Sequence, residues 1–244
     1  MENDKLKMTI NNSLNDAYDI TLYQTTSIKG LTMCSNFEPA PLEQIEALIE
    51  SQYALNLDGS LADYKSHVYP KDYCPIIIPS EDGMTVVAGQ FGLSPKWADK
   101  PVDYSTYNAR LEGIENKKTF EPPFAHNQFC LVPMQAFFEP YYIDGKNHWQ
   151  RIYRKDTEAF TIAGMFEFNP HFNDPIHTFT LLTHNADDEA FMSQFHQPKK
   201  EKRSIALVEA DKRAQYLEAS HKEIMNLMSK IEENRFEFKE SYNY

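Results

Sequence analysis

Cys34, in the segment Met33–Phe37, is a residue whose side chain could act as a nucleophile. A thiol that loses its proton forms covalent bonds with electrophilic carbon, so a free cysteine is a candidate catalytic residue. A lone cysteine is nevertheless more often a small, buried hydrophobic residue. This segment alone favours the buried role, and the catalytic role needs further support.

The segment Tyr107–Glu112 contains residue types that bind anions. Asn108 and Arg110 are two residues apart, and on an extended chain two such side chains point to the same side. Together they could hold a phosphate or a carboxylate group. The alternative is an ordinary ion pair on the surface.

Two further segments contain side chains that could move protons. Phe137–Tyr142 places Glu139 among aromatic residues, a setting that raises a carboxyl pKa as general acid or base catalysis requires. The alternative is an exposed glutamate beside an edge proline. In Phe195–Arg203, His196 is followed by four basic residues and one acid, which could equally form a solvated charged loop.

The charge of the chain restricts its partners. The 244 residues include 36 acids and 24 bases, for a net charge of −12 at pH 7. This balance argues against a non-specific nucleic-acid coat protein and against a polybasic membrane binder, but it is compatible with a local basic groove. No apolar run approaches the ~20 residues of a membrane span.

The chain contains three cysteines, which are too few and too scattered for a disulfide framework or a zinc site. There is no secretory signal pattern at the N-terminus. We therefore expect a reduced, cytoplasmic protein that uses no metal and no cofactor and has no membrane partner.

The sequence predicts a β-rich domain. Residues 1–32 are polar and are expected to be a poorly ordered extension, and Pro41 opens a short amphipathic helix. Ser80–Gly83 and Asp144-Gly145 are hairpin turns. The expected strands are 74–78, 84–88, 129–132, 137–143, 148–153, 160–168 and 177–183, and a second helix is expected at 210–231. This order predicts an α+β single domain with a curved or barrel-like, mainly antiparallel sheet and flanking helices.

Taken in order, the four candidate segments resemble one family. The matching residues are Cys34 after a methionine, the triplet Asn108-Ala109-Arg110, Phe137-Phe138-Glu139, and His196 ahead of Arg203. This pattern resembles the SOS response-associated peptidase (SRAP) family from residue 33 to about residue 208. The segments 91–100 and 130–133 also match the family, so the domain is expected to span residues 33–244.

The resemblance implies a sensor of abasic sites in single-stranded DNA. Members of the family form a covalent crosslink between an N-terminal cysteine and the aldehyde of the ring-opened abasic sugar. The α-amine forms an imine, and the thiol then closes a thiazolidine ring. An internal cysteine has no free amine for this reaction, so Cys34 would have to be the first residue of the mature chain.

The resemblance also assigns roles to individual residues. Cys34 would supply thiol and amine, Asn108 would position the cysteine or the sugar, Glu139 would shuttle protons, and His196 would assist ring opening and strand cleavage. Arg110 would hold a phosphate. Further DNA contacts are expected at Trp97, Asn36, Thr183, Lys199, Lys200 and Arg203, with Lys202 in the same basic run. The protein is expected to bind single-stranded DNA as a monomer and so to associate with the bacterial nucleoid.

The chain departs from the family pattern in several places. Ser35-Asn36 replaces the usual Gly-Arg, whose arginine contacts phosphate in the family, and the interval between His196 and Arg203 is longer than usual. The stretch before Met33 allows two hypotheses: translation begins at Met33, which is then removed, or a longer form is cut before Cys34. We favour the first, because Lys29-Gly30 can be encoded by a ribosome-binding sequence.

Two other functions remain open from the sequence alone. One is a cysteine peptidase or amidase that uses Cys34 with His196 and either Glu139 or Asn108, which would work with an internal cysteine. The other is a module that binds single strands without chemistry. Lyase and autopeptidase activities could accompany the covalent function.

Overall fold

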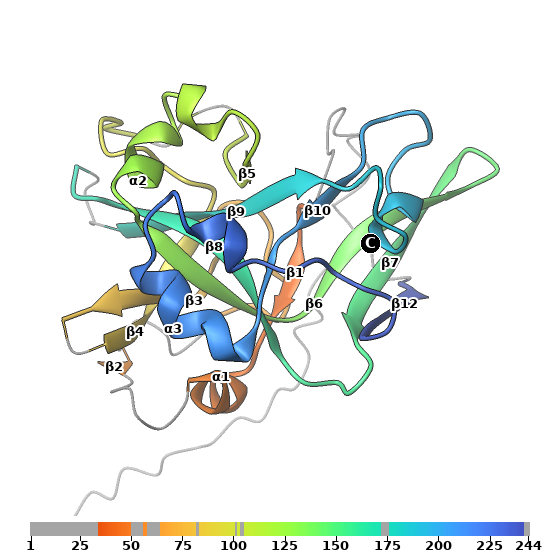
Figure 1. Cartoon of the computed structure of the whole chain (residues 1–244), viewed down its shortest axis with the longest axis horizontal. Coiled ribbons are helices and arrows are strands. Elements are labelled where there is room, and N and C mark those ends of the chain that lie inside the picture. Colours follow the sequence, from red (N-terminus) through yellow and green to blue (C-terminus); the bar gives the residue numbers. More distant parts are fainter. Residues whose placement is uncertain are drawn as a thin grey trace, which may run out of the picture. The chain divides into compact units, whose positions relative to one another are not determined.

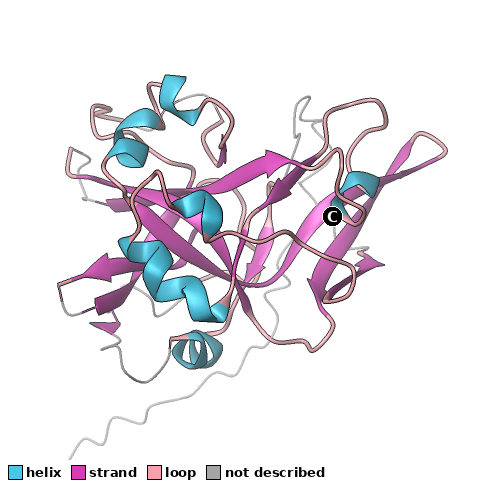
Figure 2. Cartoon of the chain, viewed as in Figure 1, coloured by secondary structure: helices cyan, strands magenta, loops and turns pink. Residues whose placement is uncertain are grey.

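The computed structural model describes residues 34–49, 56–57, 64–81, 83–100, 102, 105–171 and 176–241. The predicted extension at 1–32 lies outside these residues. The described strands are β1 (Phe37–Pro39), β2 (Asn56–Leu57), β3 (Tyr73–Ser80), β4 (Gly83–Phe91), β5 (Asn108–Arg110), β6 (Phe129–Ile143), β7 (Lys146–Arg154), β8 (Phe160–Asn169), β9 (Ile176–Asn185), β10 (Arg203–Ile205), β11 (Leu207–Val208) and β12 (Phe236–Glu240). The α-helices are α1 (Leu42–Leu48), α2 (Glu121–Ala125) and α3 (Arg213–Glu218). Strands dominate, and the helices are short (Figure 2).

Five strands close into a barrel. The order β8-β9-β4-β3-β6 returns to its start because β6 also pairs with β8. The two halves of β6 pair with different strands of one continuous sheet: Phe129–Met134 pairs with β8 and closes the barrel, and Phe137–Ile143 pairs with β7 outside the barrel. The β6–β7 hairpin extends away from the barrel, with β12 along β7 (Figure 1).

The predicted fold class is confirmed, with one qualification about strand direction. Most pairings are antiparallel, but β4 and β5 both run parallel to β9, and β2 runs parallel to β4. The two expected strands at 129–132 and 137–143 form the single strand β6. Both predicted hairpin turns are present, and Asp144 and Gly145 have φ values of 49° and 76°, as a type I′ turn requires.

The barrel strands are buried on both faces. Ile76 and Cys130 join the hydrophobic cluster that contains Cys34. Their neighbours Ile77 and Leu131 join a second cluster, which includes residues of α1 and α3. Alternation along each strand sends successive side chains to opposite faces, so the helices cover one face and the candidate nucleophile lies on the other.

The predicted helix at 210–231 is wrong as one continuous element. It forms two separate 3-10 turns and α3, and Ala219 is extended at the end of α3. The carboxylate of Glu223 accepts hydrogen bonds from the backbone N–H and the hydroxyl of Ser220, and these start a new turn. Tyr216 and Ile224 are nevertheless buried as the periodicity predicts. In the described part of the chain, no helix is long and apolar enough to cross a membrane.

A substitution at Gly164 tests how closely β6 and β8 pack where they close the barrel. A Cβ at this position would lie 2.8 Å from the Cys130 sulfur and 3.1 Å from the Thr180 carbonyl oxygen. We expect Gly164→Ala to lower the free energy of unfolding by about 1–3 kcal/mol, because overpacking strains both strands. Urea denaturation measures this change.

Cys130→Ala provides the matched control for that prediction. It removes the sulfur nearest the new methyl group, so the double variant should lose less stability than the sum of the two single variants. Additive losses would mean that Cys130 and Gly164 do not form the contact described.

Candidate functional site

Four strands bring the predicted site residues to one region. Asn108 and Arg110 lie on β5, which runs beside β9 with Arg110 opposite Thr183. Between them Ala109 is fully buried, so the two polar side chains share the opposite side, as the spacing predicts. β1 pairs with β6 through Phe37 and Phe137, and this register carries Cys34 toward Glu139.

Cys34 is held through its backbone as well as its side chain. The residue is 1% exposed. The side-chain amide of Asn108 donates a hydrogen bond of 3.1 Å to the Cys34 carbonyl oxygen, and the thiol lies 3.7 Å from the Asn36 carbonyl oxygen. These contacts fix the orientation of Cys34 relative to β5.

Glu139 contacts the backbone nitrogen of Cys34. The residue is 1% exposed, and its carboxylate accepts a hydrogen bond from the backbone N–H of Cys34. Burial raises the pKa of Glu139 well above its ordinary value, and the Cys34 N–H offsets this only in part. Glu139 is therefore a carboxyl group that takes up a proton more readily than an exposed glutamate does.

His196 is the third residue of this cluster, after Cys34 and Glu139. Its backbone N–H donates to the Pro140 carbonyl oxygen at 2.7 Å, which fastens the loop before β10 to β6. Its ring nitrogen Nδ1 lies 3.3 Å from Glu139 Oε2. The longer interval between His196 and Arg203 therefore does not displace the histidine from Glu139.

The hydrogen bonds of His196 determine where its proton lies. Nε2 is 2.9 Å from the Arg203 carbonyl oxygen, which only accepts, so Nε2 carries the hydrogen and Nδ1 presents a lone pair to Glu139. Burial lowers the pKa of His196, and the nearby charges of Lys202 and Arg203 lower it further. A neutral imidazole thus faces a carboxyl whose pKa is raised, and a proton can pass between them.

The Cys34 thiol is held in its neutral form. Burial raises its pKa well above the ordinary value, and the charge of Glu139 adds to the effect, while backbone hydrogen bonds at Phe138 and Asn36 lower it. A thiol in this environment is a poor nucleophile by itself. To act as a nucleophile, it would need a neighbour that removes the proton.

Arg203, expected to contact DNA, is buried with Thr183. The two residues are 3% and 1% exposed, and Nη2 of Arg203 donates to the Thr183 carbonyl oxygen at 3.0 Å and hydroxyl at 3.1 Å. Nη2 also pairs with Glu112 at 2.8 Å. Asn36 is 2% exposed. None of these three predicted contacts presents its side chain at the surface, so a phosphate could reach them only if neighbouring groups moved.

The remaining predicted DNA contacts are accessible. The Arg110 side chain is 54% exposed and pairs with Glu201 at 2.8 Å. Lys199 and Lys200 are exposed, whereas the ammonium of Lys202 turns inward to the carbonyl oxygens of Phe195 and His196. Trp97, at 61% exposure, lies in the loop after β4. The predicted basic run is therefore divided between two exposed lysines and two residues turned inward.

Two polar residues beside the arginines are not predicted from the sequence to be part of the site. Glu201 is the single acid within the basic run, and it contacts Arg110, Arg203 and Asn185. Asn185, at the end of β9, carries no signal in the sequence that separates it from any other polar strand end. Only the alternation of charge at Glu201 could have drawn attention to this cluster.

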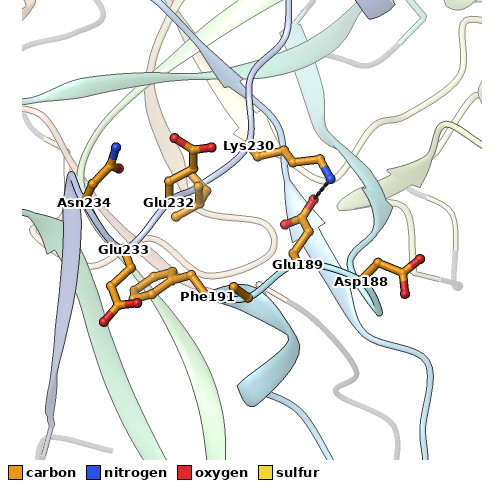
Figure 3. Close-up of a pocket in the computed structure, with 9 residues that line it drawn as sticks. Asp188, Glu189, Phe191, Lys230, Glu232, Glu233 and Asn234 are labelled. Atoms are coloured by element: carbon orange, nitrogen blue, oxygen red, sulfur yellow. Dashed lines mark ion pairs between the residues drawn. The ribbon is translucent and has the colours of Figure 1, made fainter.

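A pocket of about 350 Å³ is lined by other residues. Figure 3 shows its walls, formed by residues 188–191 and 230–234. Asp188, Glu189, Glu232 and Glu233 outnumber Lys230, so the pocket repels phosphate. None of the predicted catalytic residues lines it.

Residues 33–241 match the family model described as SOS response associated peptidase (SRAP). The chain belongs to the SRAP family. The abasic site processing protein YoqW of Bacillus subtilis is 28% identical over 158 residues, which cover 62% of this chain and 68% of that protein. YobE of the same organism, also named an abasic site processing protein, is 27% identical over 158 residues, covering 62% of this chain and 69% of YobE.

Solved structures share the SRAP fold of this chain. A protein from Bordetella bronchiseptica has a TM-score of 0.75 at 22% identity, with 85% of this chain and 99% of that chain covered. A protein from Bacteroides thetaiotaomicron has a TM-score of 0.67 at 22% identity, with 86% and 93% covered. The family resemblance inferred from the four sequence segments is confirmed.

Glu139→Gln tests the electrostatic coupling between Glu139 and the thiol. Removing this carboxylate should lower the pKa of Cys34, so that alkylation of Cys34 by iodoacetamide begins at lower pH. Mass spectrometry of the Cys34 peptide across a pH series measures the shift.

Glu167→Gln is the matched control, because Glu167 is also buried, at 4% exposure, but contacts Gln128 instead. It should leave the pH profile of Cys34 unchanged. Equal profiles for Glu139→Gln and the unmodified chain would contradict the coupling.

Proposed function

We propose that this protein processes abasic sites in single-stranded DNA and captures their aldehyde covalently through Cys34. Membership of the SRAP family supports the proposal, as do relatives named abasic site processing proteins. The proposal requires a chain in which Cys34 is the first residue, so that its nitrogen is a free amine.

The observation that carries this proposal is the contact between Glu139 and the Cys34 nitrogen. A cysteine that only fills space needs its sulfur packed, and nothing in that role calls for a buried carboxyl at its backbone nitrogen. Burying such a carboxyl costs free energy unless it is compensated. The contact is expected where this nitrogen is the reacting atom.

The proposed reaction uses each of these groups. The Cys34 amine adds to the aldehyde carbon, and the resulting carbinolamine loses water to form an imine. Glu139 donates the proton that leaves with the hydroxyl group as water, and the proton that the nitrogen gives up returns to the Glu139 carboxylate, directly or by way of the free lone pair on Nδ1 of His196. The Cys34 sulfur then bonds to the imine carbon, and the thiol proton passes through Glu139 to the nitrogen, which closes the thiazolidine ring.

Asn108 has a positioning role in this proposal. Its hydrogen bond to the Cys34 carbonyl keeps the amine directed at Glu139 while the sugar enters. Arg110, Lys199 and Lys200 would bind backbone phosphates, and Trp97 would stack on a base, worth ~1–3 kcal/mol. Asn36, Thr183 and Arg203 remain proposed DNA contacts that need local rearrangement.

The geometry gives less support to a cysteine peptidase acting on other substrates. Such an enzyme needs an activated thiolate beside a histidine. Here the pKa of the Cys34 thiol is raised, and the free lone pair of His196 faces Glu139 instead of the sulfur. Strand cleavage and self-cleavage before Cys34 are compatible with the proton path through Glu139 and His196, and they form part of the proposal.

A covalent gel shift tests the central step. A chain that begins at Cys34 should give a band that survives denaturation with a single-stranded oligonucleotide carrying one abasic site. Cys34→Ala should abolish the band, and Cys74→Ala should retain it. An intact mass that begins at Met1 in crosslinking protein would contradict the need for a free amine, and absence of the band would contradict the proposal.

Kinetics of the same reaction test the proton path. Glu139→Gln should slow crosslinking about 10²-fold or more, because general acid–base catalysis is lost, while affinity for the strand stays nearly unchanged. His196→Ala should impair strand cleavage and crosslink reversal more than capture. Glu167→Gln serves again as the control, and a full crosslinking rate in Glu139→Gln would remove Glu139 from the mechanism.

A further inference from the structure

The carboxylate of Glu201 lies between two guanidinium groups at the edge of the Cys34 site. Its Oε2 is 2.8 Å from Nη1 of Arg110, and its Oε1 is 3.0 Å from Nη1 of Arg203. The side-chain amide of Asn185 donates a third contact to Oε1 at 3.3 Å. Three donors from β5, β9 and β10 thus converge on one anion.

These donors keep Glu201 ionised. Partial burial raises the pKa of Glu201, but hydrogen bonds from Asn185 and Arg203 and the charge of Arg110 outweigh it, and the pKa is lowered. Two guanidinium groups and an amide are also donors that suit the oxygens of a phosphodiester. The arrangement therefore fits a nucleic-acid phosphate as well as it fits a carboxylate.

We propose that Glu201 occupies, in the free protein, the position that a backbone phosphate takes when single-stranded DNA binds. The inference rests on the proposed function, and it adds that the Glu201 carboxylate competes with DNA phosphate for the same donors. DNA must displace Glu201 before its phosphate can contact Arg110 and Arg203, so Glu201 lowers the affinity for every strand whose phosphate takes this position.

Two of the three donors keep other partners when Glu201 leaves. Arg203 is still held by Glu112 and by the oxygen atoms of Thr183, so its Nη1 continues to point at the vacated position. The Asn185 side chain is fixed by the backbone N–H of Asp187 at 3.0 Å. The Glu201 side chain is itself 38% exposed, and a rotation about its own bonds is sufficient to release the site.

Two of the three donors, Arg110 and Arg203, are linked through neighbouring hydrogen bonds to Cys34 and His196. Asn108, two residues before Arg110, holds the Cys34 carbonyl. The Arg203 backbone carbonyl accepts the hydrogen bond from His196. A phosphate at this position would place the adjoining sugar beside the residues that hold Cys34 and His196.

Binding to a strand that cannot react tests the inference separately from the covalent chemistry. A fluorescent single-stranded oligonucleotide with a tetrahydrofuran analogue has no aldehyde, so anisotropy reports only reversible affinity. Glu201→Gln should lower Kd about 3- to 10-fold, since two partly exposed ion pairs no longer compete. It should also steepen the dependence of log Kd on log salt, by about 0.7 for each additional phosphate that the protein neutralises.

Glu233→Gln is the matched control, because it removes the same charge at an exposed residue of the acidic pocket. It should leave Kd nearly unchanged. The amide introduced by Glu201→Gln keeps an acceptor oxygen for Arg203, so thermal unfolding should be close to that of the unmodified chain. In an Arg110→Ala background, the improvement in affinity from Glu201→Gln should shrink.

An equal or higher Kd for Glu201→Gln, or an improvement matched by Glu233→Gln, would overturn the inference. Absence of strand binding in every variant would overturn it as well. If Glu201→Gln binds more tightly but no abasic strand is crosslinked, the covalent function fails and the competing role of Glu201 stands. If abasic strands are crosslinked but Glu201→Gln changes nothing, the covalent function stands and the competing role fails.

Discussion

The site depends on a carboxyl group buried against a backbone nitrogen. Glu139 can occupy that position because β6 leaves the barrel and pairs with both β1 and β7, which brings Cys34 alongside its outer half. Burial of the carboxyl raises its pKa, and the same burial keeps the thiol and the imidazole of His196 neutral. Because a proton that moves between two neutral groups leaves a pair of buried opposite charges, which is costly, transfer among these three groups is favoured when a second proton moves with it.

The charged residues around Cys34, Glu139 and His196 differ from these three groups, because they are ionised and paired with one another. The chain as a whole is acidic, with a net charge of −12, and both Arg110 and Arg203 are paired with acids of the same protein. Binding of a polyanion to such a surface exchanges internal ion pairs for pairs with phosphate. Exchange of this kind yields little net affinity and makes binding depend on geometry, which favours a ligand that matches the spacing of the arginines.

Several elements could be predicted because their signals are local. The Asp144-Gly145 turn needs two residues with positive φ, and its own sequence specifies them. The alternation at Asn108 and Arg110 follows from strand geometry. The prediction of one helix at 210–231 was wrong because its signal is incomplete. Apolar periodicity indicates which face is buried, but it does not reveal that Ser220 and Glu223 end one turn and start another.

The amino-acid sequence was sufficient to identify the functional groups, their order along the chain, and the family to which they belong. Their protonation and their accessibility followed only from the packing of the folded chain. Cys34, Glu139 and His196 are far apart in the sequence, and the pKa of each depends on atoms that the other segments supply. The same holds for Arg203, which the sequence suggests is a surface base and which lies buried beneath Glu201 and Glu112 in the fold, because burial is a property of the packed barrel and not of any single segment.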